Sequence, residues 1–372
     1  MSDFASLREI VRQILTDTWP PLPEYASHRP LPPEPGPLLR LAEELGWREL
    51  EEDAAGFGFT AVVLEQLGSA LGPGELTTGV ALGPLLDAFT EDPSAHGAFA
   101  VSWAATDWRR EAGAPVLEGD GERLRLTGTV PWVLGAAPEA RLLVLADHGG
   151  RPAALLLPLD SEHTRLEQVD GSDPTRVFAH WTADALPVAP ARVVARDAAA
   201  EALASRARER VDLGLALDSL GVAKAALELT LAFAKVREQF DAPIGSFQAV
   251  KHRCVDMFVR VQCAEALIEE AVRRFGSGGP EAGLQAKAAA CEAAAEVTRS
   301  ALQTHGAIGY TWEHPCHLLV RRAKLNQALG TPADEARRTV GASLTRALTT
   351  FPDGAAPAAG SREGSHARLQ HG

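Results

Sequence analysis

AKVREQFDAPIGSFQ, residues 234–248, is the stretch of sequence that decides the fold. It ends one long segment rich in Ala, Leu, Glu, Arg and Lys and begins another, which predicts a turn between two helices. Arg237 offers a rigid fork of donors that suits a diphosphate. Phe240 and Phe247 provide walls for a flat ring, and Gln248 both donates and accepts hydrogen bonds. Taken alone, the stretch fits a helical hairpin turn with a surface arginine equally well.

The segments around this turn predict a helical bundle. Their composition favours long helices over the ranges 197–236, 246–275, 280–307 and 332–349. Four helices in succession predict an up–down bundle over residues 196–350. The remaining stretch, 351–372, is low in complexity and is expected to be a flexible tail.

The chain before the bundle changes character near Gly97. Upstream, residues 1–96 predict a helical domain with helices at 3–18, 38–45, 61–71 and 77–89, and with a connector at 20–37 whose prolines forbid helix. Downstream, residues 97–195 predict a β domain, because short apolar or alternating runs recur at 123–128, 140–146 and 153–158. The predicted fold class is therefore α+β and mostly helical.

Charge and cysteine usage exclude several classes of protein. The 372 residues carry a formal net charge of −13, which disfavours binding to nucleic acid. No apolar run is long enough to span a membrane, and no signal peptide is visible. None of the cysteines forms a CxxC pair, so we expect reduced thiols and a cytoplasmic protein.

Two further stretches suggest ligand binding. QTHGAIGYTWE, residues 303–313, places Gly306 and Gly309 after a helix, where they let a ligand approach the backbone closely. LTGTVPWVLGA, residues 126–136, places Trp132 at the end of a strand. Individually, these stretches also fit a helix C-terminal cap and a core tryptophan.

Together and in this order, the three stretches resemble the acyl-CoA dehydrogenase family over residues 38–348. That family carries Arg-x-x-Phe…Phe-Gln and Gln-x-x-Gly-Gly-x-Gly in its bundle and Asn-Gly-x-Lys-x-Trp in its β domain. The resemblance implies an N-terminal helical domain, a middle β domain and a C-terminal four-helix bundle. It also implies FAD bound between the β domain and the bundle, and dehydrogenation of an acyl thioester.

The resemblance assigns flavin contacts in the β domain. Trp132 matches the family tryptophan that packs against the flavin. Ser102 lies near the position of a threonine that touches the flavin from a Thr-Glu-Pro loop, although the loop here reads Ser-Trp-Ala-Ala-Thr-Asp and lacks Glu-Pro.

The resemblance also assigns dinucleotide contacts in the bundle. Arg237, Phe240 and Gln248 match residues that hold the FAD diphosphate and adenosine, as do Gln303 and Gly306. In the family these contacts lie partly across a subunit interface, which implies an obligate dimer or a tetramer. The second family glycine is Ala307 here, whose methyl group is expected to crowd the dinucleotide.

The family's catalytic base has no counterpart in this sequence. Most members place a glutamate directly before Gly-Thr, where it removes a proton from the carbon next to the thioester carbonyl. Here Leu329 precedes Gly330-Thr331, and an ungapped count from His305 reaches Gly330 instead. Neither of these side chains accepts a proton.

Two acids on the first bundle helix are candidates for a relocated base. Counting back from Gly221 to the alternative base position of the family reaches Val211, whose neighbour is Asp212. Asp218 lies two helical turns beyond Val211, on nearly the same face. Each of them also fits an ordinary solvated carboxylate.

Three explanations follow from the missing glutamate. The first is an active dehydrogenase with a relocated base or unusual regiochemistry, as in a biosynthetic enzyme acting on a chain bound to acyl carrier protein. The second is a non-catalytic subunit of a heteromeric dehydrogenase. The third is an acyl-binding homologue without turnover. Family analogy implies an electron-transfer flavoprotein, or oxygen, as the electron acceptor.

Other chemistries find little support in the sequence. His305, His314 and His317 suggest a metal, but we find no set of cysteine and carboxylate neighbours that completes a closed four-ligand site, so we interpret these histidines as structural and expect no metal. No Gly-x-Ser-x-Gly elbow is present, which leaves hydrolase chemistry unsupported.

Overall fold

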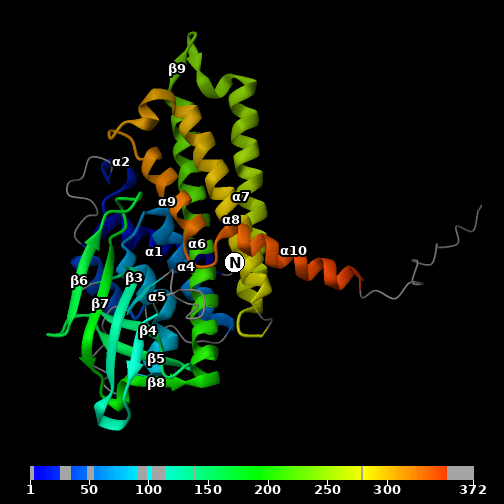
Figure 1. The fold of residues 1–372 in the computed structure, drawn as a ribbon. Coiled ribbons are helices and arrows are strands. Elements are labelled where there is room, and N and C mark those ends of the chain that lie inside the picture. The colour runs from blue at the N-terminus through cyan, green and yellow to red at the C-terminus, as the bar shows by residue number, and fades with distance from the viewer. Residues whose placement is uncertain are drawn as a thin grey trace, which may run out of the picture.

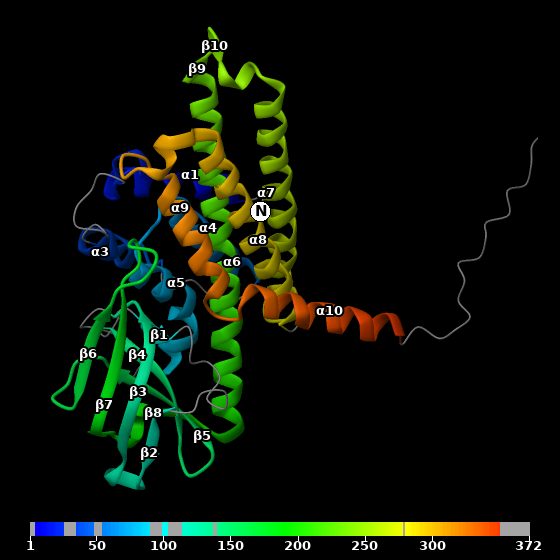
Figure 2. The same cartoon turned by 45° about the horizontal axis from the view of Figure 1, so that its top comes forward.

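Helices at both ends of the chain flank a twisted β-sheet (Figures 1 and 2). The computed structural model describes residues 4–25, 35–47, 54–89, 99–102, 114–136, 140–277 and 280–349. The predicted tail at 351–372 lies outside these residues. The α+β, mostly helical fold class is confirmed: N-terminal helices precede a central sheet, and a helical domain follows it.

The N-terminal helices are α1 (Ala5–Thr18), α2 (Leu22–Tyr25), α3 (Gly36–Glu44), α4 (Ala54–Ser69) and α5 (Gly74–Leu86). The connector prediction was wrong at α2, since a short helix tolerates proline in its first turn. Between α4 and α6, two glycines allow the backbones to touch. A Cβ added at Gly221 would lie 2.0 Å from the Glu65 carbonyl oxygen, and one at Gly68 would lie 2.3 Å from that of Asp218.

The sheet comprises β1 (Phe99–Ser102), β2 (Val116–Glu118), β3 (Arg125–Leu134), β4 (Arg141–Asp147), β5 (Pro152–Pro158), β6 (Thr164–Val169), β7 (Phe178–Pro187) and β8 (Val193–Arg196). Within the described residues its order is β6-β7-β3-β1-β4-β5-β8, with β2 pairing β3 and β4. Strand β4 is apolar on both faces. Leu143 and Leu145 join the core shared with the helices, while Leu142 and Val144 join a second core on the opposite face.

The C-terminal helices are α6 (Asp197–Val236), α7 (Gln248–Arg274), α8 (Glu281–His305), α9 (Cys316–Ala328) and α10 (Ala333–Thr349). The bundle prediction was wrong in its fourth member. Helix α9 packs against α6 and α8, whereas α10 contacts α8 and then projects from the bundle (Figures 1 and 2). No helix among the described residues combines the length and apolar character that crossing a membrane requires.

Candidate functional site

A strained hairpin caps one end of the bundle. Strands β9 (Glu238–Gln239) and β10 (Ala242–Pro243) pair across a two-residue turn formed by Phe240 and Asp241. Both turn residues are left-handed, with φ of 53° and 60°. This conformation is costly for a bulky residue, and such strain concentrates at functional sites. The Phe240 side chain is nevertheless 90% exposed, so burial of its ring does not offset the cost of this backbone conformation.

Several predicted dinucleotide contacts lie exposed on the elements next to this hairpin. Arg237 caps the end of α6, and Gln248 begins α7. In the part of the chain that the structure describes, no hydrogen bond or ion pair engages the Arg237 guanidinium. The Phe240 and Phe247 rings meet edge to face with centroids 6.1 Å apart. Together these residues present a cation, two aromatic rings and an amide to solvent.

Gln303 and Gly306 lie at the end of α8. Gln303 is exposed in the last turn, and Gly306 caps the helix with φ 67°. A Cβ built at Gly306 would meet nothing within 4 Å, so space is open beside this backbone. Ala307, the departure from the family pattern, is exposed.

Trp132 lies on β3 in the sheet. It occupies a register shift between Val130 and Val133 and has φ 53°, so the bulge turns its side chain out of the regular strand. Its backbone N–H donates to His180 Nδ1 at 3.3 Å, and its ring is 42% exposed. Ser102 ends β1, where it pairs with Val133, so the two predicted flavin contacts lie on adjacent strands.

The two groups of predicted contacts lie apart along α6. The N-terminal part of this helix follows β8 directly, and the helix packs against β5 and β8, whereas β9 begins two residues after its end. A helix of 40 residues is about 60 Å long. Figures 1 and 2 both show β9 at the end of the bundle that is far from the sheet. Trp132 and Phe240 of one copy therefore occupy different regions of the molecule.

Asp212 is engaged in a buried ion pair. Its Oδ1 lies 2.9 Å from Lys287 Nζ, and both side chains are almost fully buried. Thr331 donates to the same carboxylate from its backbone N–H at 2.8 Å and from its hydroxyl at 2.6 Å. These bonds connect α6 to the loop between α9 and α10.

Asp218 is enclosed by cations. It binds Arg176 at 2.7 Å and Arg322 at 3.2 Å, with all three side chains 0% exposed, and accepts a bond from Asn326 at 2.6 Å. Burial alone would raise the pKa of Asp218, but the two guanidinium groups and the amide outweigh it and lower that pKa. A carboxylate stabilised in this way is a weak base. The catalytic roles of both acids stay predictions, while their contacts favour a structural role.

The loop at Leu329–Thr331 leaves no room for the family glutamate at its glycine. Gly330 has φ 61°, and a Cβ there would lie 2.4 Å from Asp212 Oδ1 and 2.9 Å from Lys287 Nζ. Leu329 is 9% exposed, and its carbonyl accepts a bond from Lys287. The ion pair therefore occupies the space that a side chain at residue 330 would need.

Sequence reasoning missed the partners of these acids. Lys287 is the single charge within the apolar run of α8 from Ala286 to Cys291, a pattern that signals a buried, paired cation. Arg322 stands beside Arg321 and near Lys324 in α9, so no comparable local signal pointed to Arg322, and none pointed to Asn326 or Arg176.

Comparison with known proteins shows which family this chain belongs to. Residues 195–345 match the family described as "Acyl-CoA dehydrogenase, C-terminal domain". The chain is 30% identical over 280 residues to acyl-CoA dehydrogenase IpdE2 of Mycobacterium tuberculosis, covering 75% of each protein. The chain belongs to the acyl-CoA dehydrogenase family.

Further similarities show how much of each relative the chain represents. It is 32% identical over 280 residues to acyl-CoA dehydrogenase FadE34 of the same organism, covering 73% of this chain but only 37% of FadE34. The structure of the ChsE4-ChsE5 complex from Mycobacterium tuberculosis superposes with TM-score 0.77 at 24% identity, covering 91% of this chain and 96% of that chain. This structural similarity supports the fold alone.

The residues present fit the FAD that acyl-CoA dehydrogenases typically use. The exposed Arg237 guanidinium suits a diphosphate, and the open backbone at Gly306 permits close approach. Trp132 offers an exposed flat ring on the sheet. Acyl-CoA dehydrogenases are oxidoreductases that act on CH–CH bonds of acyl-CoA thioesters.

Proposed function

We propose that this acyl-CoA dehydrogenase takes part in FAD-dependent desaturation of an acyl thioester, with each flavin site shared between two chains. The separation of Trp132 from Phe240 along α6 carries the proposal. A dinucleotide that contacts both groups needs the sheet of one chain and the hairpin end of another. Phe240 is 90% exposed in a left-handed conformation and meets the Phe247 ring edge to face, so its ring is accessible to a neighbour's ligand.

Each group has a distinct task in this proposal. Bound FAD supplies the hydride acceptor, and the protein supplies binding and orientation. Arg237 holds the diphosphate, and Phe240 and Gln248 hold the adenosine. Gln303 and Gly306 contact the same dinucleotide. Trp132 and Ser102 orient the ring system against the sheet. Family analogy makes an electron-transfer flavoprotein the acceptor of the electrons.

Replacing Arg237 by alanine is expected to weaken FAD binding by about 10- to 100-fold, since a charge-assisted hydrogen bond contributes about 1.5–3 kcal/mol. Flavin fluorescence quenching during titration measures the change. Arg338→Ala is the matched control, because Arg338 is an exposed arginine on α10 whose ion pair, among the described residues, is with Asp334 one helical turn away. Equal FAD affinity of the Arg237 variant and the wild type would contradict this assignment.

A second candidate is a heteromeric dehydrogenase in which a chain of different sequence supplies the base. The observation that favours it is the engagement of Asp212 and Asp218 in buried ion pairs, together with the lack of a carboxylate at residues 329–331. A structure of the same fold is titled as a complex of two proteins, ChsE4 and ChsE5, which is compatible with a heteromer.

One experiment separates these candidates. The chain is purified alone, its visible spectrum is recorded, and acyl-CoA and acyl-carrier-protein thioesters are added without oxygen. Flavin that bleaches in the isolated protein supports a homomeric enzyme with its own base, and the thioester that works identifies the carrier. Flavin uptake or bleaching only after a second, glutamate-bearing family member is added supports the heteromer. Absence of flavin binding in both settings contradicts the proposed function.

A further inference from the structure

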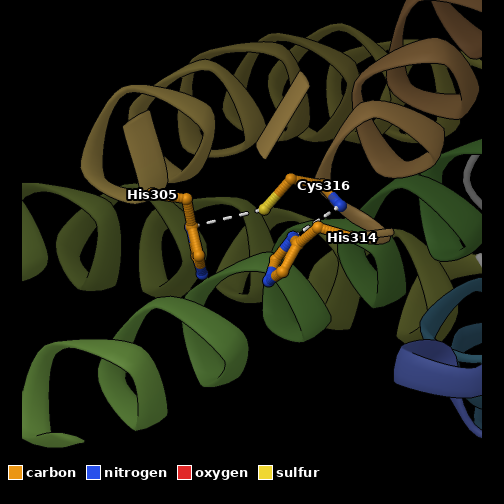
Figure 3. Close-up of side chains that lie close together, drawn as sticks. All are labelled: His305, His314 and Cys316. Atoms are coloured by element: carbon orange, nitrogen blue, oxygen red, sulfur yellow. Dashed lines mark hydrogen bonds between the residues drawn. The ribbon is translucent and has the colours of Figure 1, made fainter. Parts of the chain in front are cut away.

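Two histidines and a cysteine meet where α8 turns into α9. His305 is the last residue of α8, Cys316 is the first residue of α9, and His314 lies in the turn between them. One side-chain atom from each, a ring nitrogen or the sulfur, lies within 4.8 Å of the other two. Figure 3 shows the Cys316 sulfur directed at the His305 ring, with the His314 ring beside both.

His305 has a free lone pair in the protein interior. Its Nδ1 lies 2.8 Å from the Ala301 carbonyl oxygen, which only accepts, so Nδ1 carries the proton. Nε2 therefore has the lone pair, and it is buried without a hydrogen-bond partner on a residue that is 6% exposed. A ring nitrogen that donates to a backbone carbonyl while the other faces away is the usual arrangement of a metal-binding histidine.

His314 and Cys316 add two more donors. His314 Nδ1 accepts a long bond of 3.3 Å from the Cys316 backbone N–H, so this nitrogen also has a lone pair. The Cys316 sulfur is buried and lies 3.4 Å from His305 Nδ1, the ring nitrogen that carries the proton, so the thiol contacts this ring before any metal binds.

We propose that His305, His314 and Cys316 form a binding site for a divalent transition metal, with Zn²⁺ as the best match. Two imidazoles and one thiolate are a donor set that Zn²⁺ binds, and three protein ligands leave one position open. Tetrahedral Zn–N and Zn–S bonds place donors roughly 3.3–3.6 Å apart. The three donor atoms lie within 4.8 Å of one another without a metal, so the side chains would move closer together on binding. On binding, the thiol S–H bond is replaced by an S–Zn bond and one proton is released.

Such a site would fix the turn that follows Gln303 and Gly306. The metal would join the end of α8 to the start of α9 without touching the ion pair of Asp212. This inference is independent of the proposed function, since it needs neither FAD nor a partner chain.

Titration of tag-free, chelator-treated protein with Co²⁺, and separately with Zn²⁺ by calorimetry, tests the site. We expect one equivalent of metal to bind, a thiolate-to-cobalt charge-transfer band to appear, and about one proton to be released into weak buffer. Cys316→Ala should remove the charge-transfer band, and His314→Gln should weaken Zn²⁺ binding by roughly 100-fold or more. Because His314 is only half-buried, its variant is expected to fold even if the Cys316 variant does not.

Cys263→Ala is the matched control, since this thiol is exposed on α7 and belongs to no such cluster among the described residues. It should retain the cobalt spectrum in full. The proposal is overturned by a wild type that shows no saturable binding. It is equally overturned by a folded His314→Gln protein that binds Zn²⁺ as tightly as the wild type.

Discussion

Replacing Asp218 by alanine should lower the free energy of unfolding by about 3–5 kcal/mol, because it leaves two buried arginines without their shared carboxylate. Arg176 and Arg322 both bind Asp218, and all three side chains are 0% exposed. Arg322 retains Asp173 at 2.7 Å, whereas Arg176 loses the carboxylate that it binds through Nη2. Chemical denaturation followed by circular dichroism measures the change.

The exposed pair of α10 provides the control for this prediction. Asp334→Ala removes a carboxylate from an ion pair whose side chains are 74% and 68% exposed, and it should cost less than about 0.5 kcal/mol. A base at Asp218 would give a different pattern: thioester-dependent flavin bleaching would be lost while the unfolding free energy stayed unchanged. That result would restore the catalytic assignment and contradict the structural one.

The effect of Asp218 should depend on pH in one direction. Since its pKa is lowered from the ordinary value of 3.8, its stabilising contribution is complete above that value and is lost as pH falls through the lower native pKa. The difference in stability between wild type and Asp218→Ala should therefore be constant near pH 7 and narrow below about pH 4.

Replacing Lys287 by methionine should lower the free energy of unfolding by about 3 kcal/mol or more, because it leaves the Asp212 carboxylate buried without a cation. The loss extends beyond the pair, since Lys287 also donates to the Leu329 carbonyl. Thermal and chemical unfolding both measure it. The loop at residues 329–331 should also exchange its amide hydrogens faster, because the bond from Lys287 to the Leu329 carbonyl is lost and the bonds from Thr331 to Asp212 are weakened.

The double variant Lys287→Met/Asp212→Asn distinguishes a lost charge pair from lost packing. The amide of residue 212 still accepts the Thr331 N–H and carries no charge, so about half of the lost stability should return. If the double variant were no more stable than Lys287→Met, the stability lost would come from the volume and the carbonyl contact of Lys287 rather than from the unpaired charge of Asp212.

The sequence predicted the elements whose signals are local. Composition located α6, α7, α8 and α10 to within two residues, since Ala-rich helical segments are separated by glycine- and proline-containing turns. Helix α9 was not predicted: it begins at Cys316, just after the stretch at 303–313 that was interpreted as a ligand-binding motif, and no helix was assigned between residues 307 and 332. Phe240 and Trp132 are exposed and have positive φ, which agrees with a binding role. Their positions could be predicted only from the family motifs, because nothing in the local sequence indicates exposure or strain.

The surroundings of the acids could not be predicted in the same way. Asp218 meets Arg176 and Arg322 at separations of 42 and 104 residues, and Asp212 meets Lys287 at 75 residues. Helical periodicity places Asp212 and Asp218 about 120° apart around α6 but says nothing about which cations pack against either of them. Only the tertiary arrangement shows that both carboxylates are neutralised.

Helix α6 also constrains how this chain can change over evolution. An uninterrupted helix of 40 residues sets both the distance and the angular offset between the sheet and the hairpin at Phe240. Deleting one residue would shorten that spacing by about 1.5 Å and rotate the hairpin by about 100°. Insertions and deletions should therefore be tolerated in the loops around the sheet and be selected against along α6, so homologous chains should keep its length even where its side chains diverge.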